Sequence, residues 1–318
     1  MDKGHGGRAE GLGRALGSYY YARCGRTNSM GAVDRTATII TSGIKPAVRH
    51  AAEPLAVSAL NVAIQLTGLR MPFRKAVVAA ARLGVRGVEI DARGELRPDQ
   101  LDQTGLREVR RLLEEHELRA VAINFRTRRG YDADDQIDRR VAATKAAMRF
   151  AAQLGAPVVV NQLGRVPDDV KSPAWKLLTE TLADVGNFGH HVGASLAVQS
   201  GGQGGADLRR LIDALPEAAL VVTLDPANAI INGHSPLEDV VALGPSIAYV
   251  HARDAARDLA QGGGLEVPLG RGTADFPALL GALENFGYRG FFCVARQQAQ
   301  VPVEEFAQAV AYLNQIVQ

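Results

Sequence analysis

Short apolar runs recur along the chain from residue 60 to the end, and each is followed by a longer stretch with helical periodicity. The runs are rich in Val, Ile, Leu and Ala and lack the regular polar alternation of a half-exposed strand. A short run that is apolar on both faces is typical of a buried parallel strand. The predicted strands cover residues 60–66, 87–91, 118–125, 157–162, 194–199, 219–225, 247–251 and 290–295.

A predicted helix follows each of these strands. The first begins at Pro72 and ends before Gly84, and these residue types favour helix starts and stops. Eight strand–helix units in succession predict a (β/α)8 TIM barrel, because a doubly wound sheet more often stops at about five or six strands. The other helices are expected near residues 104–117, 134–154, 173–190, 206–215, 236–243, 276–287 and 303–316.

Residues 1–59 differ from the rest of the chain. They are rich in Gly, Arg, Ala and Ser without a sustained apolar period, so we expect a disordered tail or an over-extended start with Met30 as the initiator. A secretory signal would need a continuous apolar stretch of about 7–15 residues behind the basic start, and none is found. The expected organisation is a tail over 1–59 and one barrel domain over 60–318.

Composition narrows the class of protein further. Lys and Arg number 36 against 34 Asp and Glu, and this net charge of +2 provides no global field to attract nucleic acid or an anionic membrane. No apolar run reaches the ~20 residues that a membrane-spanning helix needs. The two cysteines, Cys24 and Cys293, suit a reducing, cytoplasmic environment without disulfides. Neither lies beside a base, so a thiol nucleophile is not expected.

Candidate chemistry lies where the later strands end. The fifth to eighth predicted strands end in Gln199, Asp225, His251 and Ala295, and TIM-barrel active sites are built at the carboxyl ends of strands. Successive members of the first three are 26 positions apart, so each strand–helix unit returns the chain to the same level along the barrel axis. We therefore expect Gln199, Asp225 and His251 to converge as an incomplete site for a divalent ion such as Mg²⁺, Mn²⁺ or Zn²⁺.

Several longer segments of the chain carry a resemblance to a known family. These segments are RGVEID at 86–91, LDPANAIINGHSP at 224–236, YVHARDAARD at 249–258 and VPLGRGTADFPALLGALENFGYRGFF at 267–292. In the order and spacing of these segments, the chain from Val62 onward resembles the sugar phosphate isomerase/epimerase family of xylose-isomerase-like barrels. The resemblance implies a TIM barrel and a metal-assisted isomerase or epimerase that moves a proton beside a carbonyl.

The resemblance also implies a metal held by Glu, Asp, His and Glu, with the two glutamates trading the substrate proton. Asp225 and His251 match the family pattern, whereas Gln199 and Ala295 stand at the two glutamate positions. Glutamine has no usable pKa and alanine offers no ligand, and loss of one general base typically costs ~10²–10⁴ in rate. We therefore expect a weakly bound or absent divalent metal and impaired or altered catalysis.

Other charged residues at the predicted rim are candidates for substrate binding. Arg257 matches a position where sugar epimerases of this type hold substrate, Glu89 is placed to bind a hydroxyl from across the barrel, and Asp254 follows His251. Arg126 belongs to an arginine cluster after the third strand. Together with glycine-rich loops after the fifth and seventh strands, these arginines favour a sugar or sugar phosphate as the ligand.

Three readings remain open at this point. The first is the isomerase or epimerase, and the second is a non-catalytic barrel, a possible pseudoenzyme, that binds a sugar-like ligand or a partner protein. A DNA-repair endonuclease on the same barrel is disfavoured because its multi-zinc cluster needs more histidines than the rim supplies. A homo-oligomer is compatible with each reading.

Overall fold

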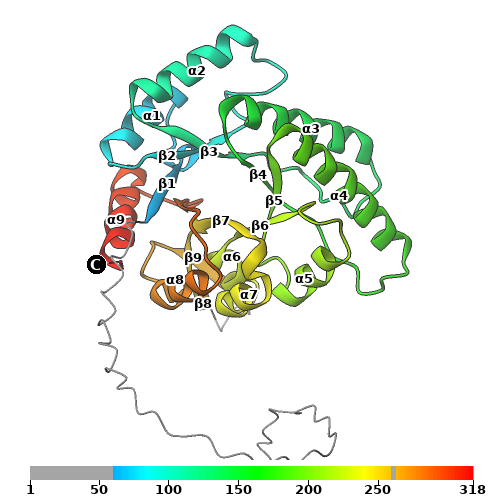
Figure 1. The fold of residues 1–318 in the computed structure, drawn as a ribbon. Helices are drawn as coiled ribbons and strands as arrows, with labels where there is room; N and C mark the ends of the chain where they lie inside the picture. The colour runs from blue at the N-terminus through cyan, green and yellow to red at the C-terminus, as the bar shows by residue number, and fades with distance from the viewer. Residues whose placement is uncertain (1–59, 259–262, 318) are drawn as a thin grey trace, which may run out of the picture. The chain divides into compact units, whose positions relative to one another are not determined.

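A closed barrel of eight parallel strands forms the centre of the computed structural model, which describes residues 60–258 and 263–317. The expectation for residues 1–59 lies outside these described residues. Around the barrel the strand order is β1, β10, β7, β6, β5, β4, β3, β2, and the predicted TIM barrel is confirmed (Figure 1). The strands are β1 Asn61–Gln65, β2 Gly87–Asp91, β3 Arg119–Asn124, β4 Val158–Asn161, β5 Ser195–Gln199, β6 Val221–Leu224, β7 Ile247–Ala252 and β10 Phe291–Val294.

Helices cover the outside of the barrel, as a parallel sheet that is apolar on both faces requires. Their starts follow the capping chemistry of the sequence: for example, Ser172 accepts a hydrogen bond from Trp175 N just before a helix that begins with Pro173. The main helices are α1 Phe73–Arg82, α2 Gln103–Glu115, α3 Ile137–Leu154, α4 Pro173–Val192, α5 Gly205–Asp213, α7 Pro236–Leu243, α8 Phe276–Asn285 and α9 Pro302–Gln315.

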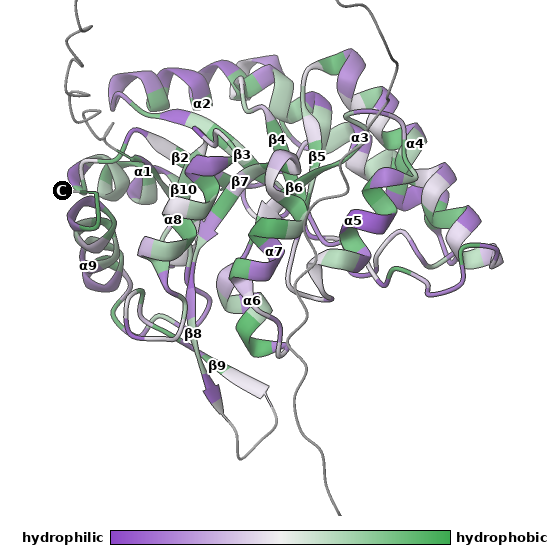
Figure 2. Ribbon diagram, turned by 60° about the horizontal axis from the view of Figure 1, so that its bottom comes forward, coloured by the Kyte–Doolittle hydropathy of each residue, from purple (hydrophilic) through white to green (hydrophobic). Residues whose placement is uncertain are grey.

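Two apolar layers hold these elements together, and the barrel strands are accordingly green at the centre of Figure 2. The larger layer lies between strands and helices and includes Ile64, Val88 and Leu196. The smaller one fills the barrel interior with residues such as Ala197, Tyr249 and Cys293. Because side chains alternate along a strand, the inward positions recur every second residue up to the carboxyl end, where they become polar.

The region after β7 is where the predicted secondary structure is wrong. We expected a glycine-rich loop, but β8 (Asp254–Asp258) and β9 (Gly263–Val267) form an antiparallel hairpin. The Asp254 carboxylate stabilises the end of the hairpin that is nearest to β7. It accepts hydrogen bonds from the backbone N–H groups of residues 255, 270, 272 and 274 at 2.8–3.1 Å. The hairpin packs on a further short helix, α6 (Pro226–Ile231), and both elements lie beside the barrel mouth.

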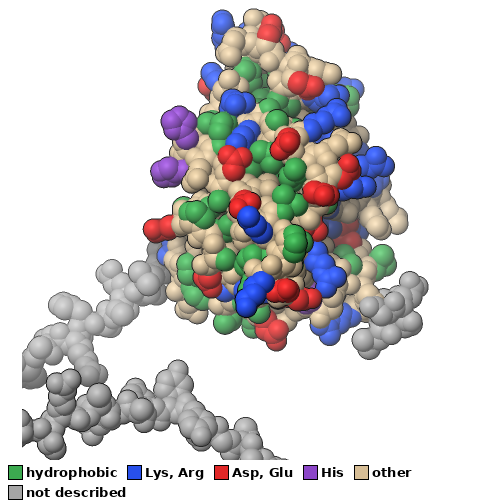
Figure 3. All heavy atoms as spheres, turned by 90° about the vertical axis from the view of Figure 1, so that its right-hand side faces the viewer, with side chains coloured by type: hydrophobic (Ala, Val, Ile, Leu, Met, Phe, Trp, Pro, Cys, Tyr) green, Lys and Arg blue, Asp and Glu red, His purple; other side chains and the backbone are tan. Residues whose placement is uncertain are grey.

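The remaining short elements are the 3-10 turns η1 (Leu66–Leu69) and η2 (Gly244–Ser246). On the flank formed by α3, α4 and α5, Lys and Arg side chains are interspersed with Asp and Glu, and apolar side chains are scattered (Figure 3). In the described part of the chain no helix is both long and apolar enough to cross a membrane.

Candidate functional site

The polar side chains at the carboxyl end of the barrel form a continuous buried network. Glu89 on β2, Asp225 just after β6 and His251 on β7 point inward, and each is at most 2% exposed. Gln199 ends β5 beside them. The structure therefore brings together the three residues expected to form one site, and adds Glu89 from the opposite wall of the barrel.

His251 lies between two carboxylates. Its Nε2 atom is 2.8 Å from Glu89 Oε2, and its Nδ1 atom is 3.5 Å from Asp225 Oδ2. Glu89 is further held through Oε1, which accepts hydrogen bonds from Gln65 Nε2 at 2.7 Å and Asn124 Nδ2 at 2.8 Å. Since the two ring nitrogens face away from each other, the carboxylates of Glu89 and Asp225 do not converge on a common point.

These contacts determine the protonation states of Glu89 and His251. Burial opposes ionisation of Glu89, but the charge of His251 and three hydrogen bonds outweigh it and lower the pKa of Glu89 to about 2. Burial likewise opposes protonation of His251, but Glu89 and Asp225 outweigh it and raise the pKa of His251 to about 9. At neutral pH the pair is therefore a carboxylate and an imidazolium, and neither group is poised to exchange protons.

Arg253 is the second buried cation of the network and is 6% exposed. Its Nη1 atom donates to Asp225 Oδ2 at 2.7 Å, and its Nε and Nη2 atoms lie 2.9 and 2.8 Å from Glu266 Oε1. Burial opposes this charge, but the two carboxylates outweigh it and raise the pKa of Arg253 above its usual value. The guanidinium therefore stays charged and ties the end of β6 to β9.

Glu266 places a carboxylate beside the end of β10. Its Oε2 atom accepts hydrogen bonds from the backbone N–H groups of Gln297 and Gln298, both at 3.0 Å. Arg296 approaches the same oxygen at 3.6 Å through Nη1. Ala295 follows β10 directly and is buried, so Glu266 supplies from the hairpin an acid that the strand itself lacks.

The donor set around Asp225 does not fit a divalent metal. Its Oδ1 atom accepts from Asn228 N at 2.9 Å and caps α6, while Oδ2 accepts from Arg253 and from Gln199 Nε2. Gln199 thus turns an amide N–H, not its oxygen, toward the carboxylate. Within residues 60–258 and 263–317, no group of three or more His, Cys, Asp or Glu side chains is arranged to hold a metal ion.

The residues expected to bind substrate separate into different surroundings. Arg126 lines a polar pocket of about 230 Å³ at the ends of β3, β4 and β5, with Gln199 in the same wall. Arg257 is exposed on the hairpin, where Nη2 lies 3.5 Å from Gly233 O. Asp254 is buried and engaged with backbone N–H groups, and Glu89 is fully buried beneath the rim. Of these four residues, Arg126 alone lines that pocket.

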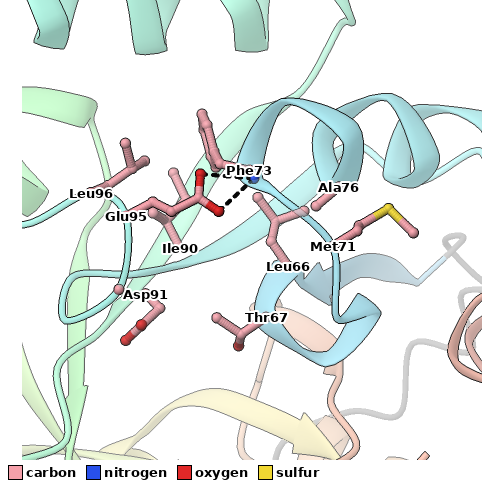
Figure 4. Close-up of a pocket in the computed structure, with 10 residues that line it drawn as sticks. Leu66, Thr67, Met71, Phe73, Ala76, Ile90, Asp91, Glu95 and Leu96 are labelled. Atoms are coloured by element: carbon pink, nitrogen blue, oxygen red, sulfur yellow. Dashed lines mark hydrogen bonds between the residues drawn. The ribbon is translucent and has the colours of Figure 1, made fainter. Parts of the chain in front are cut away.

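A second pocket, of about 160 Å³, lies between the loops after β1 and β2 (Figure 4). Its walls are mostly apolar and include Leu66, Met71 and Ile90, and Glu95 at its edge accepts a hydrogen bond from Phe73 N. Burial raises the pKa of Asp91, which lies at the end of β2 in this pocket. An apolar lining of this kind offers few partners for the hydroxyl groups of a sugar.

Sequence reasoning missed Arg253 and Glu266. Arg253 could have been found, because it stands two residues after His251 and the alternation of a strand predicts that both face inward. Glu266 gave no comparable signal. Its contact with Arg253 depends on the pairing of β8 with β9, and a glycine-rich sequence does not predict that pairing.

Residues 77–316 match the family model for xylose isomerase-like TIM barrels. Three solved structures show the same fold. A xylose isomerase domain protein from Planctomyces limnophilus aligns with a TM-score of 0.73 and 22% identity over 81% of this chain and 98% of that chain. A xylose isomerase-like TIM barrel protein from Mycobacterium smegmatis, in complex with magnesium, aligns with a TM-score of 0.66 and 18% identity. The alignment covers 83% of this chain and 98% of that chain.

A sugar phosphate isomerase/epimerase from Parabacteroides distasonis gives a TM-score of 0.65 and 14% identity over 83% of this chain and 98% of that chain. The comparison with curated proteins found no match.

The charge on His251 predicts a specific pH dependence of stability. A pKa raised from 6.5 to about 9 in the folded state contributes stability that is complete below pH 6.5 and is lost as pH rises through 9. We expect the free energy of unfolding of the wild type to fall by on the order of 3 kcal/mol over this window relative to His251→Gln. Urea unfolding at a series of pH values measures the difference.

His190→Gln is the matched control, because His190 is exposed at the end of α4. This variant should keep the pH dependence of the wild type. If His251→Gln also kept it, the imidazolium between Glu89 and Asp225 would not be the group that titrates.

Proposed function

Because the chain belongs to the xylose isomerase-like TIM barrel family, we propose that it binds a small sugar-like molecule at the mouth of the barrel without a divalent metal. In this proposal the guanidinium of Arg253 occupies the carboxylate of Asp225 that a metal would need, and Arg126 is the cation that lines the ligand pocket. The observation that carries the proposal is the contact of Arg253 with Asp225 at 2.7 Å and with Glu266 at 2.8 Å, in a buried position.

Electrostatics argues against a guanidinium and a metal sharing Asp225. Two like unit charges 4 Å apart repel by about 4 kcal/mol at an effective dielectric constant of about 20, and a divalent ion doubles this. A metal would also need Gln199 to turn its amide and Arg253 to give up its contact with Asp225. Metal binding therefore competes with contacts that the chain already makes.

The polar pocket beside this network is suited to a polyhydroxylated ligand. Amide side chains both donate and accept hydrogen bonds, as hydroxyl groups do, and four of them line the pocket. Arg126 adds a positive charge at its edge, which favours a carboxylate or phosphate on the ligand. The amides are Gln162, Gln199, Gln203 and Asn228.

Among the described residues of this network, family-type proton transfer has no free base. The Glu266 carboxylate beside the end of β10 is engaged by Arg253 and by two backbone N–H groups. Gln199 and Ala295 cannot accept a proton at the glutamate positions. His251 is held protonated by Glu89 and Asp225, and the pKa of Asp225 is well below its usual range because its contacts with Arg253 and His251 outweigh burial. We therefore propose ligand binding rather than epimerisation or isomerisation. A cytoplasmic location is part of the proposal and follows from the cysteine content alone.

The metal content of the purified protein tests the central part of the proposal. After dialysis the wild type should hold less than one equivalent of Mg²⁺, Mn²⁺ and Zn²⁺ together, as measured by inductively coupled plasma mass spectrometry. Gln199→Glu with Ala295→Glu should raise the content by restoring two anionic ligands. Adding Arg253→Met should raise it further, because the competing cation is removed.

Arg257→Gln removes an exposed arginine on β8, four residues after Arg253, and should leave the metal content unchanged. A full equivalent of metal in the wild type would contradict the proposal. If the glutamate pair changed neither metal content nor ligand binding, the assignment of Gln199 and Ala295 to the glutamate positions would be wrong.

Thermal shifts test the ligand class. A sugar phosphate or sugar acid at a hundredfold excess over its Kd should raise the melting temperature by about 5 °C or more. Arg126→Gln should reduce this shift for anionic compounds, whereas the exposed and distant Arg82→Gln should not. A screen of neutral, acidic and phosphorylated sugars in which none stabilises the protein would count against a sugar-like ligand.

A further inference from the structure

A separate pocket on the other side of the β3–α3 loop is lined mainly by arginines. It has a volume of about 630 Å³, and five of its lining residues are arginines whereas only Asp135 is acidic. The formal charge of its lining is therefore +4. We propose that this arginine pocket, which includes Arg93, Arg128, Arg129, Arg139 and Arg140, binds a small polyanion that carries two or more phosphoryl or carboxylate groups.

Internal contacts fix three of the five guanidinium groups without neutralising the pocket. Arg129 Nη1 pairs with Asp135 Oδ2 at 2.8 Å, and Arg140 donates to the carbonyl oxygens of Ala133 and Asp135 at 2.9 and 2.7 Å. Arg93 lies over the Phe125 ring, with its Cζ atom 5.0 Å from the ring centroid. These contacts hold three of the charged groups in place, so those three side chains lose little entropy when an anion binds.

Arg128 and Arg139 are the two arginines best placed to meet a ligand. Both are exposed, and neither forms an ion pair with any residue in the ranges 60–258 and 263–317. A guanidinium presents a planar fork of N–H donors that matches the oxygens of a phosphate or carboxylate. Like charges gathered around one concave surface repel one another, and a polyanion relieves that repulsion.

The loop that presents Arg128 and Arg129 is anchored from below by buried groups. Asn161 Oδ1 accepts hydrogen bonds from Thr127 N and Thr127 Oγ1 at 2.9 and 3.1 Å. Gly130 passes so close to the loop after β4 that a Cβ atom would lie 2.2 Å from Leu163 O. These contacts restrain the backbone that carries Arg128 and Arg129.

The lining favours a small molecule over a nucleic acid. Proteins that bind single strands combine positive charge with aromatic side chains on which the bases stack. The arginine pocket has no aromatic residue among its described lining residues, and the whole chain carries a net charge of only +2. Charge without a stacking surface suits clustered phosphoryl or carboxylate oxygens.

The experiment is isothermal titration of the full-length protein with inorganic tripolyphosphate, with citrate as the carboxylate probe. Arg128→Gln with Arg139→Gln should weaken binding of tripolyphosphate at least tenfold. Arg82→Gln with Arg86→Gln removes the same charge at the opposite, amino-terminal end of β2 and should change the affinity by less than twofold. Affinity should fall as NaCl is raised, because screening weakens exposed charges.

Each result bears on the proposal directly. Citrate binding with the same loss in the double variant would extend the ligand class to carboxylates, and its absence would restrict the class to phosphoryl compounds. The proposal is overturned if the wild type does not bind tripolyphosphate at millimolar concentration, or if both double variants lose affinity equally. Tighter binding of a single-stranded oligonucleotide, lost in Arg128→Gln/Arg139→Gln, would replace it with a nucleic-acid site. These outcomes do not depend on the metal or sugar experiments, because Arg126 faces the other pocket.

Discussion

The buried contact of Arg253 with Asp225 and Glu266 determines which carboxylates remain available at the mouth of the barrel. A guanidinium that is 6% exposed needs carboxylate partners, because an uncompensated buried charge is strongly destabilising. Removing one partner of such a contact typically costs about 3–5 kcal/mol. The contact also connects β7 with the end of β6 and with β9, so the hairpin and the barrel rim are coupled through one side chain.

Arg253 is also part of a network of buried ion pairs at the carboxyl end of the barrel. The network holds three carboxylates, Glu89, Asp225 and Glu266, against two cations, Arg253 and protonated His251, with Arg296 nearby as a third. His251 lies between Glu89 and Asp225, and these two carboxylates keep it protonated around neutral pH. A catalytic pair would instead need one group with a pKa near the working pH. These charge states support the proposed binding of a ligand and not a proton relay.

Much of the fold could be predicted from the sequence, since eight apolar runs separated by helical periods leave few alternatives to the barrel. The inward positions of Gln199, Asp225 and His251 also followed from the strand ends, because parallel strands return to the same rim. The limits were set by contacts between segments distant in sequence. Glu89, a candidate for binding a hydroxyl, also accepts a hydrogen bond from His251 across the barrel, and no local pattern predicts that contact. Glu266 reaches the network only because β9 folds back on β8, which no local pattern indicated.

A crystal structure of the wild-type protein soaked in a high concentration of MnCl₂, with data collected to locate manganese by anomalous scattering, tests the account most directly. We predict that Arg253 remains between Asp225 and Glu266 and that no anomalous peak lies within coordination distance of Asp225 or His251. A manganese ion bound to both Asp225 and His251, with Arg253 displaced, would contradict the claim that Arg253 occupies the carboxylate that a metal would need.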